Sequence, residues 1–131
     1  KDAQQLIIIK KMVNDLNIPV QIIPCPIVRE ESGLALSSRN KYLSEEDKQQ
    51  ALVLSRILNN IKQCYKKGIT DIEALKETAY NFLNEHHELE YLEFLNQENL
   101  EEIKQADDNT RVFIACKVGG VRLIDNILLG E

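Results

Sequence analysis

The chain has 131 residues, of which 44% are hydrophobic, and this is enough apolar material for the core of one domain or slightly more. Sixteen Lys and Arg residues against 21 Asp and Glu residues give a formal net charge of −5. An acidic chain without a basic stripe argues against nucleic-acid or membrane-surface binding as its main role, and no apolar run approaches the roughly 18 residues of a membrane span.

The three cysteines, Cys25, Cys64 and Cys116, are far apart in the sequence and form no C-x-x-C pair. An odd number of widely spaced thiols is typical of a protein in a reducing compartment. We therefore predict reduced, buried thiols and a cytoplasmic location.

Residues 4–16 place apolar side chains on one face of a helix, and Pro19 lies just beyond its end. Lys1 and Asp2 lie at the start of this helix, where free N–H groups and the positive end of the helix dipole favour a bound anion. Gln5 follows one turn later, so its amide can face the same ligand. In the alternative interpretation, Asp2 only caps the helix and Lys1 is solvated.

Residues 19–28 are rich in branched apolar side chains, the composition of a buried strand, although Pro24 and Pro26 restrict its ladder hydrogen bonds. A helix that leads into a strand predicts the last step of a doubly wound sheet, in which ligands bind beyond the carboxyl ends of the strands. Val28 and the loop after it fall at that end. The three charged residues that follow are predicted to be solvated: Arg29, Glu30 and Glu31.

Residues 33–40, Gly-Leu-Ala-Leu-Ser-Ser-Arg-Asn, have the composition of a phosphate-binding loop. Ser37 and Ser38 can each offer a hydroxyl and a backbone N–H to phosphate oxygens, while Arg39 adds a fixed fork of donors with a permanent charge. Gly33 leaves the backbone open to close approach. The same residue types also form ordinary turns ahead of a helix, so the motif alone leaves both interpretations open.

From Ser44 the pattern becomes helical, with a serine cap followed by acidic residues and a stop at Gly68. A second helix is expected from about Thr70 to His86 and His87, whose imidazoles suit the negative end of the helix dipole. No carboxylate spacing beside the two histidines supports a metal or catalytic site.

The last third of the chain has the pattern of a small sheet. Residues 89–95 fit a strand or a helix, and residues 96–104 are predicted to form a turn and a short helix. Residues 111–118 and 121–129 flank two glycines, a link that suits a tight hairpin.

These elements predict an α+β fold in two parts. Residues 1–43 form the last helix–strand step of a Rossmann-like α/β domain, together with the Ser-Ser-Arg loop. Residues 44–131 form a small C-terminal domain of helices packed on an antiparallel sheet.

Three stretches of the sequence carry a resemblance to a known family. They are Lys-Asp-Ala-Gln-Gln at residues 1–5, residues 26–43 with the Ser-Ser-Arg motif, and Val-Arg-Leu-Ile-Asp-Asn at residues 121–126. The chain resembles the pantothenate synthetase (pantoate-beta-alanine ligase) family nearly from end to end. In that family the Ser-Ser-Arg loop is the counterpart of the mobile "KMSKS" loop of related nucleotidylyl-transferring folds.

The resemblance implies ATP and Mg²⁺ as cofactors, pantoate and β-alanine as substrates, and a pantoyl-adenylate intermediate. It assigns the backbone of Val28 to the adenine ring and Gln5 to pantoate. The other residues that it assigns to ATP are Lys1, Asp2, Leu36, Ser37, Ser38 and Arg39. Four of these are expected to act in catalysis by stabilising the leaving pyrophosphate: Lys1, Ser37, Ser38 and Arg39. A homodimer is a possible state of the full-length enzyme.

The family's other nucleotide signature, a His-x-Gly-His type motif, does not occur in these residues. We therefore expect the chain to be the C-terminal part of a longer protein, carrying half of an active site and inactive alone. Two alternatives stay open: another nucleotidylyl transferase of the same superfamily, and a non-catalytic binding or lid module.

Overall fold

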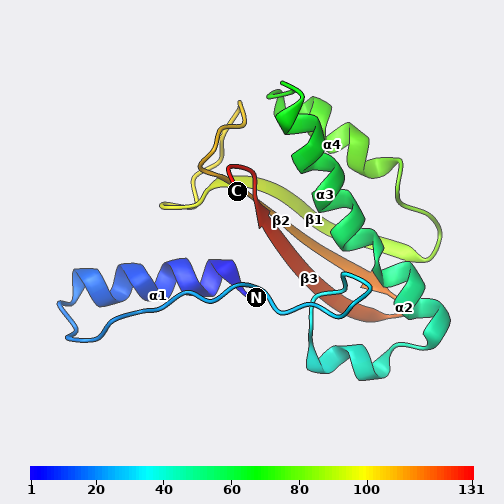
Figure 1. The fold of residues 1–131 in the computed structure, drawn as a ribbon, viewed down its shortest axis with the longest axis horizontal. Coiled ribbons are helices and arrows are strands. Elements are labelled where there is room, and N and C mark those ends of the chain that lie inside the picture. The colour runs from blue at the N-terminus through cyan, green and yellow to red at the C-terminus, as the bar shows by residue number, and fades with distance from the viewer.

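An antiparallel sheet in the order β1-β2-β3 carries the fold, and helices cover one of its faces (Figure 1). The structure is a computed structural model that describes residues 1–131. The strands are β1 (His87–Asn96), β2 (Thr110–Val118) and β3 (Val121–Leu128). The helices are α1 (Ala3–Asp15), α2 (Glu45–Ala51), α3 (Val53–Lys66), α4 (Ile72–Tyr80) and the 3₁₀ helix η1 (Ser38–Tyr42). The predicted α+β class is confirmed, and no helix is long and apolar enough to cross a membrane.

The main core lies between the sheet and α3. Every second residue of β2 from Val112 to Val118 points into it, as the two-residue period of a strand requires. On α3 the fully buried side chains follow helical spacing at Ile57, Leu58 and Ile61. Leu34 and Leu43 belong to the same core, so the segment with the Ser-Ser-Arg loop is packed against the helices and the sheet at both of its ends.

The local signals for helix ends and turns are confirmed. Ser44 caps α2, because its Oγ accepts a hydrogen bond of 3.1 Å from the Asp47 N–H. Gly68 follows α3 with a φ of +102°, the left-handed conformation that ends many helices. Gly119 and Gly120 both have positive φ and connect β2 to β3 as a tight hairpin.

The second helix ends earlier than its apolar pattern predicted. The structure ends α4 at Tyr80, and Phe82 beyond it is 37% exposed. His86 and His87 therefore do not lie at a helix end. His87 instead joins the turn to α2, because its Nδ1 accepts a 3.1 Å hydrogen bond from the Asn84 N–H and its Nε2 lies 2.9 Å from the Gln50 carbonyl oxygen.

Residues 89–95, which fitted two templates, lie in strand β1. The short helix predicted within residues 96–104 is absent, and only the turn is formed. The Asn96 side chain explains this, since its Oδ1 accepts hydrogen bonds from the N–H groups of Glu98 and Asn99. Such side-chain bonds compete with the helical ladder and favour turns.

Helix α1 is formed as predicted, but the strand predicted over residues 19–28 is not. The backbone of residues 21–27 makes no hydrogen bond to other backbone groups, because no strand of the chain lies beside it. The segment runs back along α1, and these two pieces project from the rest of the molecule (Figure 1). No residue of α1 is buried, and its apolar side chains Ile8, Met12 and Leu16 are exposed.

The three cysteines are free, as predicted, but they are not all buried. Cys116 is buried on β2, Cys64 is half-buried on α3, and Cys25 is exposed. Burial raises the pKa of the Cys116 thiol to about 11, because the thiolate would lose its hydration.

Cys116 is expected to resist alkylation at about pH 8 while Cys25 reacts, because only the thiolate is a nucleophile and the raised pKa keeps Cys116 protonated. Iodoacetamide labelling followed by peptide mass spectrometry measures both sites in one sample. Cys116 should become reactive in denaturant or as the pH approaches its raised pKa. Equal labelling of the two thiols in the folded chain would contradict the burial of Cys116.

Candidate active site

The segment before the Ser-Ser-Arg loop forms a small hairpin. Arg29 pairs with Ala35 in an antiparallel bridge, and the Glu30 N–H donates to the Leu34 carbonyl at 2.8 Å. Gly33 has a φ of +97° and its N–H donates to the Glu30 carbonyl, so this glycine serves the turn itself. The hairpin delivers the chain to Leu36, whose N–H donates to the Val28 carbonyl at 2.9 Å.

The Ser-Ser-Arg motif opens the 3₁₀ helix η1. Ser37 is its N-cap, with an Oγ that accepts a 3.2 Å hydrogen bond from the Arg39 N–H. Buried Asn40 ties the turn to the hairpin, because its Nδ2 donates to the Ala35 carbonyl at 3.2 Å. Ser38 and Arg39 are exposed at the surface of this supported turn, where they are available to a ligand.

At the start of α1, Asp2 is the N-cap and accepts a 3.0 Å hydrogen bond from the Gln5 N–H. The carboxylate of Asp2 therefore has the capping role that the sequence left as one of two interpretations. Gln5 is exposed, and Val28 and Leu36 are also open, at 66% and 54% exposure. These side chains are accessible, but no group of this chain closes over them.

Strand β3 contributes a carboxylate that the sequence did not predict. Asp125, with a side chain only 2% exposed, forms a two-bond ion pair with Arg29, at 2.7 Å to Nη1 and 2.9 Å to Nη2. The pairing raises the pKa of the Arg29 guanidinium. The prediction that Arg29 is a solvated loop charge is wrong, because the residue joins the hairpin to a strand 96 positions away.

The residue after it, Asn126, is also buried and reaches the start of the chain. Its Nδ2 donates to the Lys1 carbonyl at 2.7 Å, and its Oδ1 accepts from Arg111 Nη1 at 2.7 Å. On the same strand the Arg122 carbonyl lies 3.5 Å from Arg39 Nη1, a long contact that places the loop beside β3. Strand β3 thus touches both predicted phosphate-binding elements.

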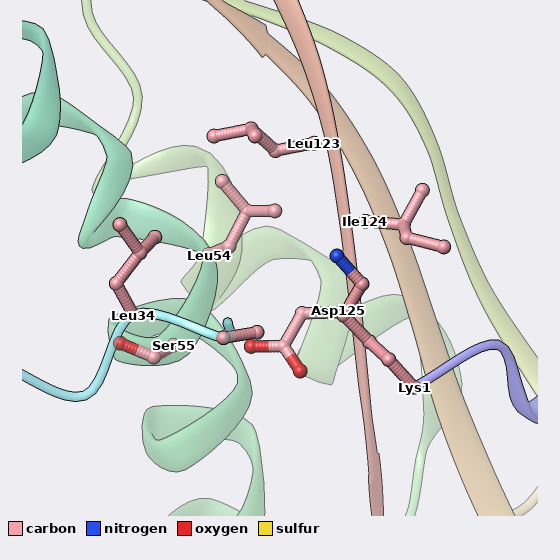
Figure 2. Close-up of a pocket in the computed structure, with 8 residues that line it drawn as sticks. Lys1, Leu34, Leu54, Ser55, Leu123, Ile124 and Asp125 are labelled. Atoms are coloured by element: carbon pink, nitrogen blue, oxygen red, sulfur yellow. The ribbon is translucent and has the colours of Figure 1, made fainter. Parts of the chain in front are cut away.

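The Lys1 ammonium is directed into a small pocket between β3 and α3 (Figure 2). Its walls are Leu34, Ala35, Leu54, Ser55, Leu123, Ile124 and Asp125. Burial lowers the pKa of Lys1, and the nearby charge of Arg39 adds to this effect, while the charge of Asp125 opposes it. The Lys1 side chain and the Arg39 guanidinium thus both lie beside β3, Lys1 in the pocket that Asp125 also lines and Arg39 at the Arg122 carbonyl.

A polar hollow adjoins this region on the face of the sheet that the helices leave open. It measures about 110 Å³, and it is bounded by the first turn of α1 and by Tyr91, Phe113, Arg122, Ile124 and Asn126. Ligand pockets are commonly ~300 Å³ or larger, so the hollow is a partial site. The chain contains no group of three His, Cys, Asp or Glu residues that could hold a metal ion.

A family model described as Pantoate-beta-alanine ligase matches residues 1–128 of the 131. The chain belongs to the pantoate-beta-alanine ligase family. Its sequence is 47% identical over 133 residues to a pantothenate synthetase of Geotalea uraniireducens and 46% identical over 131 residues to one of Caldicellulosiruptor bescii. These alignments include 100% and 98% of this chain, but only 47% and 46% of the two relatives.

Solved structures of pantoate-beta-alanine ligases share the fold. A structure of the enzyme from Thermus thermophilus superposes with a TM-score of 0.90 at 38% identity, covering 100% of this chain and 48% of that chain. A structure from Francisella tularensis has a TM-score of 0.61 at 32% identity, covering 42% of its own chain. The chain thus spans about half the length of the ligases that it matches.

Three residues that the sequence did not single out contact the predicted site elements or support those contacts: Asp125, Asn126 and Arg111. Asp125 and Asn126 lie in the Val-Arg-Leu-Ile-Asp-Asn stretch that carries part of the family resemblance. Polar side chains in a hydrophobic strand need partners, and this rule could have marked Asp125 and Asn126 as residues paired with distant groups.

Proposed function

We propose that this chain is the C-terminal half of a pantoate-beta-alanine ligase that condenses pantoate with β-alanine and converts ATP to AMP and pyrophosphate. The observation that carries the proposal is that strand β3 contacts both Lys1 and the Ser37-Ser38-Arg39 loop, which brings two cationic residues to the same strand. Membership of the ligase family supports the choice of substrates. The Francisella tularensis relative was solved in complex with beta-gamma ATP and β-alanine, which supports the same ligand classes here.

In the first step a pantoate carboxylate oxygen attacks the α-phosphorus of ATP. The bond from that phosphorus to the bridging oxygen breaks, pyrophosphate leaves, and pantoyl adenylate forms. Negative charge builds on the leaving phosphates. Lys1 and Arg39 stabilise it electrostatically, and Ser37 and Ser38 donate hydrogen bonds.

In the second step the amine of β-alanine attacks the acyl carbon of the adenylate. The bond to AMP breaks, the nitrogen loses one proton, and pantothenate is released. No side chain of this chain is required as a covalent nucleophile, so its residues act by positioning the reactants and by neutralising charge.

For the nucleotide we propose contacts with Asp2, Leu36 and the Val28 backbone, in addition to the cations and serines. The Val28 carbonyl already accepts from Leu36, but both residues are exposed and can meet an adenine ring. Gln5, exposed one turn into α1, is proposed to hold pantoate. Asp125 is occupied by Arg29 and Asp2 by its cap, so these residues form no magnesium site, and a metal ion would depend on phosphate oxygens.

We also propose that residues 1–43 belong to the nucleotide-binding part and residues 44–131 to the C-terminal domain, with Leu34 and Leu43 docking the first part on the second. Helix α1 and residues 18–28 expose large apolar side chains, among them Ile8, Leu16 and Ile23, which suits packing against the other half of a ligase. A homodimeric full-length enzyme and a cytoplasmic location, the latter supported by three free thiols, complete the proposal.

Exchange of labelled pyrophosphate into ATP tests the first step in the full-length ligase that we propose carries this sequence. Adenylate formation is reversible, so the label should enter ATP when pantoate is present, without any need for β-alanine. Exchange that proceeds without pantoate, or that another carboxylic acid supports better, would contradict the substrate assignment.

A further inference from the structure

Three positions of β3, the Arg122 carbonyl and the side chains of Asp125 and Asn126, contact the two elements that carry the proposed phosphate-binding groups. We refer to these three positions as the β3 clamp. Resting on the proposed function, we propose that Asp125 and Asn126 are positioning residues, which hold the Ser-Ser-Arg loop and Lys1 at the separation that adenylate formation requires.

The Asp125 half of the β3 clamp acts through Arg29. Both carboxylate oxygens are used by the guanidinium, and Oδ1 also accepts the Asn126 N–H at 2.8 Å. Arg29 Nη1 donates in addition to the Gly33 carbonyl at 3.1 Å, which fixes the hairpin that leads to Ser37. A fork of two parallel bonds defines orientation as well as distance, so the hairpin cannot rotate freely against β3.

The Asn126 half of the β3 clamp holds Lys1 at the start of α1. Its amide spans from Arg111 on β2 to the Lys1 carbonyl, with both contacts at 2.7 Å. Asn126 and Asp125 are neighbours on one strand, so the start of α1 and the hairpin are held against the same short piece of backbone. The buried position of both side chains excludes competing water and keeps these bonds strong.

This arrangement explains why a carboxylate is retained in the sheet. A buried ion pair rarely adds net stability over well-packed apolar residues, because the cost of removing two charges from water offsets their attraction. The Asp125–Arg29 pair instead fixes the relative geometry of groups that lie in separate segments. It also places a carboxylate in the pocket that the Lys1 side chain enters.

The test uses two nearly isosteric variants of the full-length ligase. Asp125→Asn puts an amide N–H₂ against the Arg29 donors, and Asn126→Asp replaces the donor to the Lys1 carbonyl but keeps the acceptor for Arg111. The control variant is Asp108→Asn, which changes an exposed carboxylate that accepts a hydrogen bond from Tyr65 at 2.6 Å. Steady-state kinetics and pantoate-dependent pyrophosphate exchange are measured for each, together with the thermal midpoint.

Misplacement of reacting groups costs about tenfold to a hundredfold in rate, so kcat should fall by that factor in both variants while KM for pantoate changes little. Asp108→Asn should keep the wild-type rate. An unchanged kcat in either variant, measured on protein with a wild-type thermal midpoint, would overturn the proposal. A lowered kcat that returns to the wild-type value at a temperature where the variant is fully folded would also overturn it. Absence of pantoate-dependent exchange in the wild-type enzyme would instead refute the proposed function.

A further measurement uses chemical rescue. Arg29→Ala removes the partner of Asp125, and added guanidinium ion at low, non-denaturing concentration can occupy the vacated place. Recovery of kcat with guanidinium, but not with the same concentration of sodium, supports a positioning role for the pair. Recovery of the thermal midpoint without recovery of kcat would overturn it.

Discussion

Replacement of Arg39 by alanine in the full-length ligase is expected to slow adenylate formation by about a hundredfold, the typical cost of removing one well-placed charge-stabilising donor. The guanidinium is exposed on the turn η1 and lies beside β3, so it is free to bind the leaving pyrophosphate and stabilise its growing negative charge. The effect should fall on kcat with little change in KM for pantoate, because the interaction strengthens in the transition state. Pyrophosphate exchange and single-turnover quench measurements give the rate of this step directly.

Lys41→Ala is the matched control, since Lys41 is a second exposed cation on η1 whose ammonium lies 5.1 Å from the Tyr42 ring centre. It should leave the rate of adenylate formation near the wild-type value. Equal losses of rate and of pantoate affinity in Arg39→Ala would count against a transition-state role. An equally large effect of Lys41→Ala would show that general positive charge, and not the position of Arg39, is required.

Ile57→Ala is expected to lower the free energy of unfolding by about 2–5 kcal/mol, the range for truncation of a fully buried isoleucine. Ile57 lies in the centre of α3, has 0% exposure and belongs to the core beneath the sheet. Its truncation leaves a cavity in addition to the lost transfer free energy. Urea unfolding followed by circular dichroism measures the change.

Two further variants locate the effect. Ile57→Val removes one methylene and should cost only about 0.5–1.5 kcal/mol. Asn59→Ala changes an exposed residue of the same helix and should stay within roughly 0.5 kcal/mol of the wild type. A loss in Ile57→Ala no larger than that in Asn59→Ala would mean that α3 does not pack on the sheet as described.

Elements with a complete local signal could be predicted from the sequence. The cap at Ser44, the stop at Gly68 and the glycine hairpin after β2 each depend on a few adjacent residues, and all three are present. The strand over residues 19–28 lacked such support. Its apolar composition is real, but a strand also needs a neighbour, and no strand of this chain supplies one.

The candidate site divides in the same way. The Ser-Ser-Arg loop and the start of α1 were recognisable as short motifs, and the structure brings both of them to β3. The pairing of Arg29 with Asp125 could not be predicted, because the two residues are separated by 96 positions and the residues around each of them do not indicate its partner. The assignment of individual residues to ATP and pantoate stays a prediction.

The most direct test of the ligase assignment is AMP release from ATP by the full-length enzyme, with pantoate and β-alanine each supplied or omitted. We expect continuous AMP release only when both are present, because the adenylate retains AMP until the amine of β-alanine displaces it. Continuous release without β-alanine, or release that needs a different acceptor, would contradict the account and would make the Ser37-Ser38-Arg39 loop a nucleotide site of another transferase.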